Sequence, residues 1–153
     1  MKTEIIEVSP FYLAGITVRT TNQNGQSQKD IGGLWQRIMQ GNLLVKLKGK
    51  LSDDIYCVYT DYESDYLGFY TCLIGCRVAS LDHIPDGFAG ITIAAGKYHV
   101  YYPEGKFPEK VHVAWQEIWK SDIKRAYTAD FDVYSADARS FEETEVKIYL
   151  AIA

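Results

Sequence analysis

An aspartate and a tyrosine two positions apart are the residues of this sequence best placed to do chemistry. In TADFDVYSAD, residues 128–137, Asp132 and Tyr134 alternate with Phe131 and Val133. A β-strand places residues i and i+2 on one face, so Asp132 and Tyr134 are expected to share a side. If that side is solvated, the acid needs no partner. If it lines an aromatic cleft, the carboxylate becomes a site for a positively charged ligand.

The remaining chemistry-bearing residues form no metal or phosphate motif. His83, His99 and His112 have no metal-ligand spacing with the cysteines. The segment DIGGLW lacks the lysine and spacing of a phosphate-binding loop, and no G-x-S-x-G motif occurs. We therefore expect no metal and no cofactor. Catalysis would need Asp132, or less favourably Glu145, as a general base with a pKa raised by burial.

Composition and cysteine usage indicate a cytoplasmic protein. Cys57, Cys72 and Cys76 are an odd number and lie in apolar, strand-like runs, which favours free buried thiols. No run approaches the ~18 apolar residues of a membrane span, and MKTEIIEVSP lacks the apolar core of a signal peptide. The net charge of -4 without a basic stripe argues against a nucleic-acid surface.

Two amphipathic helices are predicted to hold the tryptophans. Ile31, Leu34, Trp35 and Ile38 recur at i, i+3, i+4 and i+7, and Gly41 can end that helix. The tryptophans on such a stripe fit a plain hydrophobic core as well as the wall of a cleft. The matching stripe of the second helix consists of Val111, Trp115, Ile118 and Trp119.

Short sequence matches in the same order indicate an internal duplication. Most have an offset of 75 residues, and the helix match has an offset of 80. The offset of 75 makes Tyr59 the counterpart of Tyr134 and Cys57 the counterpart of Asp132, so only the second half carries an acid there. The matched pairs are AGIT (14–17 and 89–92), VYT and VYS (58–60 and 133–135), LWQRIM and AWQEIW (34–39 and 114–119), and YTCLIGCRV and EVKIYLAIA (70–78 and 145–153), the last of which pairs Ile74 with Tyr149.

The duplication predicts an α+β fold. Each half reads as strand, helix, strand, strand, and two such βαββ units are expected to form one antiparallel sheet with two helices and pseudo-twofold symmetry. Ligand clefts tend to form where two such units meet, so a central cleft is expected. We expect one domain over residues 1–153, with a first repeat at about 4–78, a linker at 79–87 and a second repeat at about 88–153.

The second half carries motifs of a known family. GITI followed by GKYHVYY, the helix AWQEIW, the strand FDVY and the terminal strand VKIYLAIA resemble the GyrI-like effector-binding domain, also called the AraC-type or bacterial effector-binding domain. The resemblance extends from about residue 4 to the end of the chain. It implies a duplicated βαββ fold whose cleft binds small, often aromatic and cationic molecules between aromatic side chains and one buried acid.

The resemblance also implies which residues bind the ligand. The family acid falls on Asp132 and the tyrosine of the last strand on Tyr149, while further aromatic walls fall near Trp35, Trp115 and Tyr59. Tyr134, on the same strand face as Asp132, completes the expected set. The family usually has Glu at the acidic position, and the shorter Asp makes contact with a ligand charge indirect or lost.

The alternation of side chains along the last strand predicts which face of the sheet carries Tyr149. Tyr149 shares a strand face with Glu145 and Lys147, and the opposite face is apolar. If the apolar face packs on the helices, Tyr149 is outside that core, and it is expected to line the cleft.

We expect a standalone binder of a small hydrophobic, cationic or drug-like molecule, acting in transcriptional regulation or in sequestration of drugs and toxins. The resemblance leaves two alternatives open: a hydrolase of strained cyclopropane-type compounds, and a gyrase-inhibitor-like module that binds a protein. A protein partner would be a regulator or gyrase. The repeat begins within the first dozen residues, which leaves no room for a DNA-binding domain. The sequence leaves the oligomeric state open.

Overall fold

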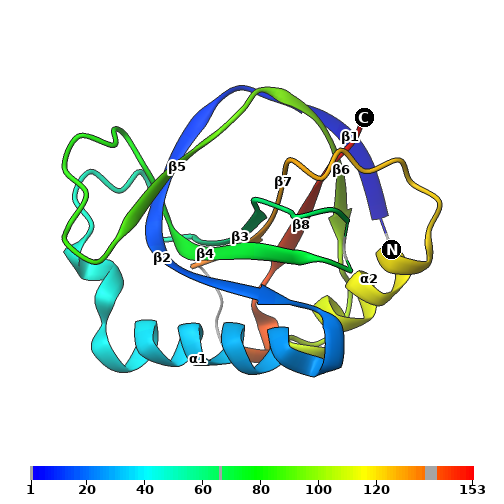
Figure 1. Ribbon diagram of the computed structural model, residues 1–153, viewed down its shortest axis with the longest axis horizontal. Coiled ribbons are helices and arrows are strands. Elements are labelled where there is room, and N and C mark those ends of the chain that lie inside the picture. The colour runs from blue at the N-terminus through cyan, green and yellow to red at the C-terminus, as the bar shows by residue number, and fades with distance from the viewer. Residues whose placement is uncertain (1, 66, 137–140) are drawn as a thin grey trace.

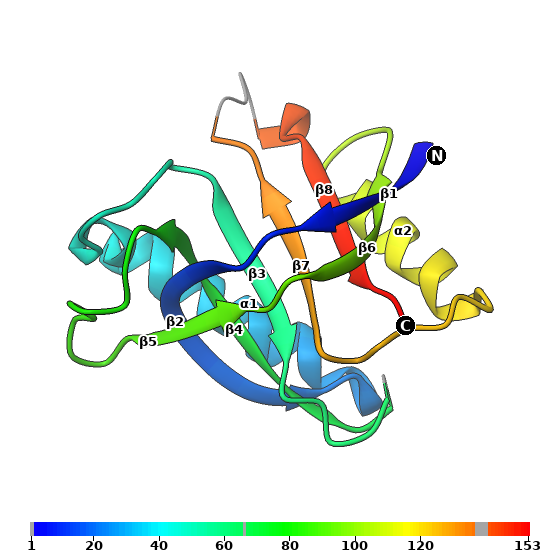
Figure 2. The same ribbon diagram turned by 90° about the horizontal axis from the view of Figure 1, so that it is seen from above.

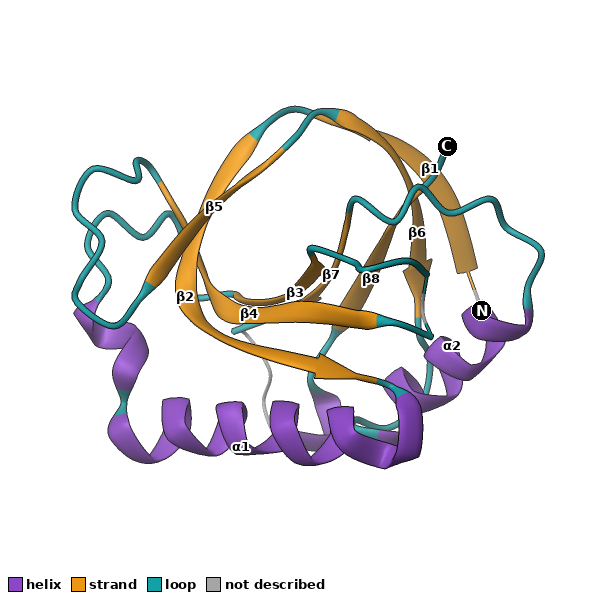
Figure 3. Cartoon of the chain, viewed as in Figure 1, coloured by secondary structure: helices purple, strands orange, loops and turns teal. Residues whose placement is uncertain are grey.

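The protein is an α+β fold in which two helices cover one face of an eight-stranded sheet (Figures 1 and 3). The computed structural model describes residues 2–65, 67–136 and 141–153. The expected fold class is therefore confirmed. The strands are β1 (Lys2–Val8), β2 (Phe11–Thr21), β3 (Ile55–Thr60), β4 (Phe69–Val78), β5 (Ala89–Ile93), β6 (Gly96–Tyr102), β7 (Ala129–Tyr134) and β8 (Val146–Ala151); the helices are α1 (Gln26–Gly41) and α2 (Glu109–Lys120), with short 3-10 turns at Gln23–Gly25, Leu43–Lys46 and Phe141–Glu143.

The sheet has the order β1-β6-β8-β7-β3-β4-β2-β5, and every pair of neighbours is antiparallel. β3 and β7 form its centre, one from each half of the chain. The outer strands curve away from the helices and close around a hydrophobic cluster on the other face (Figure 3). The buried members of that cluster are Phe11, Leu13, Val58, Leu73, Ile93, Tyr98, Val100, Ala129, Phe131 and Ala151.

Both helices pack through the apolar stripes predicted from the sequence. Leu34 and Ile38 of α1 are buried against Cys57 and its neighbours on β2, β3 and β4. Ala114 and Ile118 of α2 are buried against β6 and β8. Seen from above, α1 lies under β2, β3 and β4, whereas α2 lies at the β6–β8 side (Figure 2). The helices therefore leave the centre of the sheet between them.

The central strand pair shows how the two halves meet. Cys57 of β3 lies directly opposite Asp132 of β7 in the antiparallel register. These are the two residues that the offset of 75 predicted to be counterparts, so a pseudo-twofold axis passes between them. The same register places Ile55 opposite Tyr134. The pairing of β3 with β7 is symmetric on the other side of the axis.

The AGIT match does not identify equivalent positions. The first copy lies in β2, which pairs with both β4 and β5, while the second lies in β5. Ala14 pairs directly with Gly90, so the two copies are neighbours in the sheet. β6, which pairs with β8 as β2 pairs with β4, is the true counterpart of β2. At the start of each half the structure has two strands where the sequence predicted one. The additional strands, β1 and β5, form the two edges of the sheet.

Cys57, Cys72 and Cys76 are free and buried, as expected. The Sγ atoms of Cys57 and Cys72 lie 3.5 Å apart on the helix-facing side of the sheet. Within the described residues, no helix is long and apolar enough to cross a membrane.

Candidate functional site

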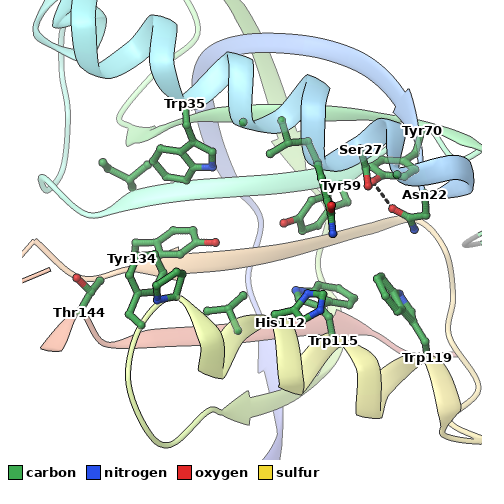
Figure 4. A pocket seen from close by; sticks show the side chains of 18 of the residues that line it. Asn22, Ser27, Trp35, Tyr59, Tyr70, His112, Trp115, Trp119, Tyr134 and Thr144 are labelled. Atoms are coloured by element: carbon green, nitrogen blue, oxygen red, sulfur yellow. Dashed lines mark hydrogen bonds between the residues drawn. The ribbon is translucent and has the colours of Figure 1, made fainter. Parts of the chain in front are cut away.

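A large cavity lies between α1 and α2, over the centre of the sheet (Figure 4). Its volume is about 1060 Å³, and most of the side chains around it are aromatic or aliphatic. Trp35 reaches into it from α1, and Trp115 and Trp119 from α2, with Tyr59 and Tyr134 on the strands between them. Further side chains around the cavity are those of Ile31, Met39, Ile55, Tyr62, Leu67, Tyr70, Phe107, Val111, His112 and Arg125.

Asp132 lies beneath the cavity and is completely buried, with 0% of its surface exposed. The Tyr59 hydroxyl donates to its Oδ2 atom at 2.8 Å, and the Tyr134 hydroxyl donates to the same atom at 3.2 Å. The Trp115 indole N–H donates to Oδ1 at 3.2 Å. All three donors line the cavity. The carboxyl group therefore influences the cavity through three aromatic residues that contact it.

Burial raises the pKa of the Asp132 carboxyl to about 7, because loss of water penalises the charged form. The hydrogen bonds from Tyr59, Trp115 and Tyr134 lower the pKa, since they favour the ionised form, and the charge of Asp130 raises it. Burial, followed by the Asp132 charge, raises the pKa of both tyrosines well above the ordinary value. At neutral pH the carboxyl can therefore change its charge while the tyrosines remain donors.

The aromatic walls pack edge to face, a geometry that aromatic pairs favour. Trp35 meets Tyr134 with ring centroids 5.3 Å apart at 87°, and Tyr59 meets Trp115 at 5.5 Å and 82°. Tyr70 supports the far side of Tyr59 at 5.9 Å. The structure thus brings together five of the six residues expected from the sequence: four line the cavity, and Asp132 lies behind them.

Tyr149 lies on the other side of the sheet. It is opposite Phe131 in the β7–β8 register and stacks on that ring, with centroids 4.6 Å apart at 13°. A second contact joins it to Tyr98, also in the cluster enclosed by the curved sheet. As predicted, Tyr149 lies on the face of β8 that points away from the helices. The cavity, however, is on the helix-facing side of the sheet, so the prediction that Tyr149 lines the cleft is wrong.

A second buried acid lies two residues before Asp132. Asp130 is 0% exposed, and its Oδ2 accepts hydrogen bonds from Arg125 at 2.8 Å and from the Tyr62 hydroxyl at 2.5 Å. Its Oδ1 accepts the Ala151 backbone N–H at 2.8 Å. This cluster was not among the residues predicted from the sequence, although Asp130 lies on the same face of the strand as Asp132, which was the available signal.

Among the described residues, no group of three or more His, Cys, Asp or Glu side chains could hold a metal ion. The arrangement can therefore be described in terms of aromatic surfaces, two buried acids and one arginine.

Sequence comparison places the chain among effector-binding proteins. Residues 4–152 match the family described as Cass2, integron-associated effector binding protein. The chain is also 31% identical over 144 residues to YobU of Bacillus subtilis (strain 168), whose name describes a transcriptional regulator. That alignment covers 91% of this chain and 90% of YobU.

Two solved structures have the same fold. The integron cassette protein from the mobile metagenome of Vibrio cholerae has a TM-score of 0.76 at 30% identity, covering 99% of this chain and 95% of that one. SAV2435, solved bound to tetraphenylphosphonium, has a TM-score of 0.80 at 22% identity, covering 100% and 94%. At that identity the second likeness concerns the fold alone.

Proposed function

Because the chain belongs to the Cass2 family of integron-associated effector binding proteins, we propose that it binds a small aromatic cation in the cavity between α1 and α2. This membership agrees with the resemblance of the sequence to GyrI-like effector-binding domains. The observation that carries the proposal is Asp132, a fully buried carboxyl whose three hydrogen-bond donors all line an aromatic cavity. The relative bound to tetraphenylphosphonium supports the same ligand class.

The cavity attracts a cation through its walls. When Asp132 is ionised, Tyr59 and Tyr134 donate to it and leave their ring faces for the ligand. The negative faces of the tyrosine and tryptophan rings add about 0.5 to 2 kcal/mol each for a cation placed over them. A bound cation also offsets the cost of an ionised carboxyl in this buried position. Contact between the acid and the ligand is therefore indirect, as the shorter side chain of Asp implies.

The cavity favours a class of ligands over a single shape. Its walls are rings on two helices, three strands and the segments between them, and its volume of about 1060 Å³ exceeds that of many drug-sized sites. Ring faces accept any flat or bulky apolar body, since they make no shape-specific hydrogen bonds. We infer that charge and aromatic surface select the ligand. Binding of this kind serves either to sequester a toxic cation or to signal its presence to a regulatory partner, the role suggested by the name of YobU.

The same geometry gives less support to hydrolysis. A general base must come within about 2.6–3.2 Å of the proton that it removes, or act through one water. The two oxygens of Asp132 already accept three hydrogen bonds beneath the cavity. A substrate would have to displace one of the aromatic donors to reach the carboxyl.

Intrinsic fluorescence tests the proposal directly, because all three tryptophans of the chain line the cavity. We expect saturable quenching by tetraphenylphosphonium and much weaker binding of tetraphenylborate, which has the same shape and the opposite charge. Affinity for the cation should rise with pH and level off above about 7, because it depends on ionised Asp132. Below that pH the affinity should fall by at most about tenfold per pH unit, until it reaches the affinity of the protein with a neutral Asp132.

The paired ions separate charge from shape. Equal affinity for the two would show that the cavity binds apolar bodies without regard to charge, and no quenching by either would refute the proposed ligand class. Triphenylphosphine oxide, a neutral relative, serves as the control for hydrophobic binding alone.

A further inference from the structure

Arg125 is a second buried, charged side chain next to the cavity, besides Asp132. Arg125 lies in the cavity wall, although its side chain is only 6% exposed. Its Nη2 atom donates to Asp130 Oδ2 at 2.8 Å. An arginine so deeply buried beside an aromatic cavity is unusual, because charged side chains are rarely buried unless they are paired. Its pairing is therefore informative.

The pairing of Arg125 is incomplete. Its Nε and Nη1 atoms are buried and have no hydrogen-bond partner among the described residues. Buried donors are nearly always satisfied, and one left unpaired is costly. The guanidinium carbon instead lies over aromatic rings, 4.4 Å from the Tyr127 centroid, 5.8 Å from Trp115 and 6.0 Å from Tyr62. The rings stabilise the charge by cation–π attraction without supplying acceptor oxygens.

Asp130, the acid of the pair, has hydrogen-bond partners on both carboxyl oxygens. Asp130 accepts hydrogen bonds from Arg125 and Tyr62 on Oδ2 and from the Ala151 N–H on Oδ1. The cluster as a whole therefore has donors left over and no matching acceptor. A ligand that brings an acceptor oxygen to Arg125 would complete it, and a guanidinium matches a carboxylate especially well.

Trp115 joins this cluster to the acidic part of the cavity. Its indole N–H donates to Asp132, and its ring lies within 5.8 Å of the Arg125 guanidinium. A single flat molecule packed against Trp115 would thus have the Asp132 tyrosines near one end and Arg125 near the other. The two buried charges are of opposite sign, and both lie next to Trp115.

From this arrangement we propose that Arg125 is a second ligand-binding residue, and that the cavity takes bipolar aromatic molecules with a cationic end and a carboxylate or similar acceptor. The inference rests on the proposed function and refines its ligand class. The cation lies over Tyr59 and Tyr134, and the acceptor meets the unpaired nitrogens of Arg125. Aromatic cations without an acceptor still bind, but they leave the arginine unsatisfied.

Two dyes that differ only at the acceptor test the inference. Rhodamine B carries a xanthylium cation and a free carboxylate, whereas its ethyl ester keeps the cation alone. We expect the parent protein to bind the free acid more tightly than the ester at pH 8, measured by dye anisotropy and tryptophan quenching. In Arg125→Gln that preference should fall by about tenfold, as expected for a lost charge-assisted hydrogen bond. Arg125→Lys, which keeps a cation, should retain part of it.

The variants must also separate binding from folding. Arg125→Gln leaves Asp130 without its cation, which can destabilise the protein. The double variant Arg125→Gln/Asp130→Asn removes both charges and should show the same loss of preference, measured within each protein as the ratio of its affinities for the acid and the ester. A parent protein that binds the ester as well as the acid overturns the inference and leaves the proposed function intact, as does a preference that is the same in all variants. Failure to bind either dye argues against the proposed function itself.

Discussion

Asp132→Asn is expected to weaken tetraphenylphosphonium binding by about 30-fold at pH 8, or about 2 kcal/mol. At that pH the parent carboxyl is largely ionised, because its pKa is about 7. The amide keeps the size of the side chain but carries no charge. Its oxygen can accept the Trp115 N–H, and its NH₂ group can donate to the hydroxyls of Tyr59 and Tyr134, which also accept hydrogen bonds. The aromatic walls should therefore stay in place. Isothermal titration calorimetry measures the loss.

Asp82→Asn is the matched control for this change. It removes the same charge from an exposed residue in the segment between β4 and β5. We expect it to change affinity by less than about twofold, because exposed charges are screened by solvent and salt. Binding of triphenylphosphine oxide should be nearly the same in all three proteins. Asp132→Asn with the parental affinity for the cation would refute the role of the acid.

The same substitution should stabilise the protein at high pH. The pKa of Asp132 is raised from 3.8 to about 7 on folding. Between these values the unfolded chain releases its proton while the folded protein keeps it, so parental stability falls as pH rises through this window and then levels off. Asn cannot ionise. The free energy of unfolding of Asp132→Asn should therefore exceed that of the parent by an amount that grows to about 4 kcal/mol above pH 7.

Denaturant unfolding of both proteins at pH 4, 5.5, 7 and 8.5 measures this difference. Subtracting the parent from the variant removes the contributions of all other titrating groups, provided that they are unchanged. At pH 4 the two proteins should be closest, because both side chains are largely neutral there. A difference that is constant with pH would mean that Asp132 titrates at its ordinary pKa and is not desolvated.

These two expectations have opposite signs, and that contrast is informative about function. The ionised acid is expected to cost stability in the free protein, yet we propose that it makes the main electrostatic contribution to ligand affinity. A residue with only a structural role would be expected to stabilise the fold. Both results together would identify Asp132 as a charge kept in an unfavourable place for a partner to neutralise.

Much of the cavity could be predicted from periodicity. The helical spacing of Leu34 and Ile38 predicted which side of α1 packs on the sheet, and the alternation in β7 placed Asp132 and Tyr134 on one face. The repeat offset identified Cys57 as the counterpart of Asp132, and the two lie opposite each other. Local patterns were sufficient here because each depends on one element and its immediate neighbour.

The last strand shows where such patterns fail. The sequence match paired Ile74 with Tyr149, but Cys57 pairs with Ile74 and Asp132 pairs with Ile148, so the counterpart of Ile74 is Ile148. A shift of one residue moves a side chain to the opposite face of a strand. Parity alone also could not predict that the face of β8 away from the helices would be enclosed by the curvature of the sheet around Phe131.

Arg125 could not be predicted from local patterns for another reason. Arg125 lies outside the regular strands, with only an isolated bridge to Ile152, so no periodicity indicates its direction. Its neighbours Tyr62 and Trp115 come from other parts of the fold. The charge content of the chain is ordinary, so nothing in the sequence marks this arginine and this aspartate as a buried ion pair. The pair becomes apparent only in the tertiary structure.

The most direct test of the proposed role of Asp132 in cation binding is the titration of its carboxyl group. Carbon-13 NMR of protein labelled at the aspartate carboxyl, with the signal assigned by its absence in Asp132→Asn, measures the pKa with and without saturating tetraphenylphosphonium. We predict a pKa of about 7 for Asp132 in the free protein, lowered by about one unit or more by the bound cation. A pKa near 4 in the free protein, or one that the cation leaves unchanged, would contradict the proposed role.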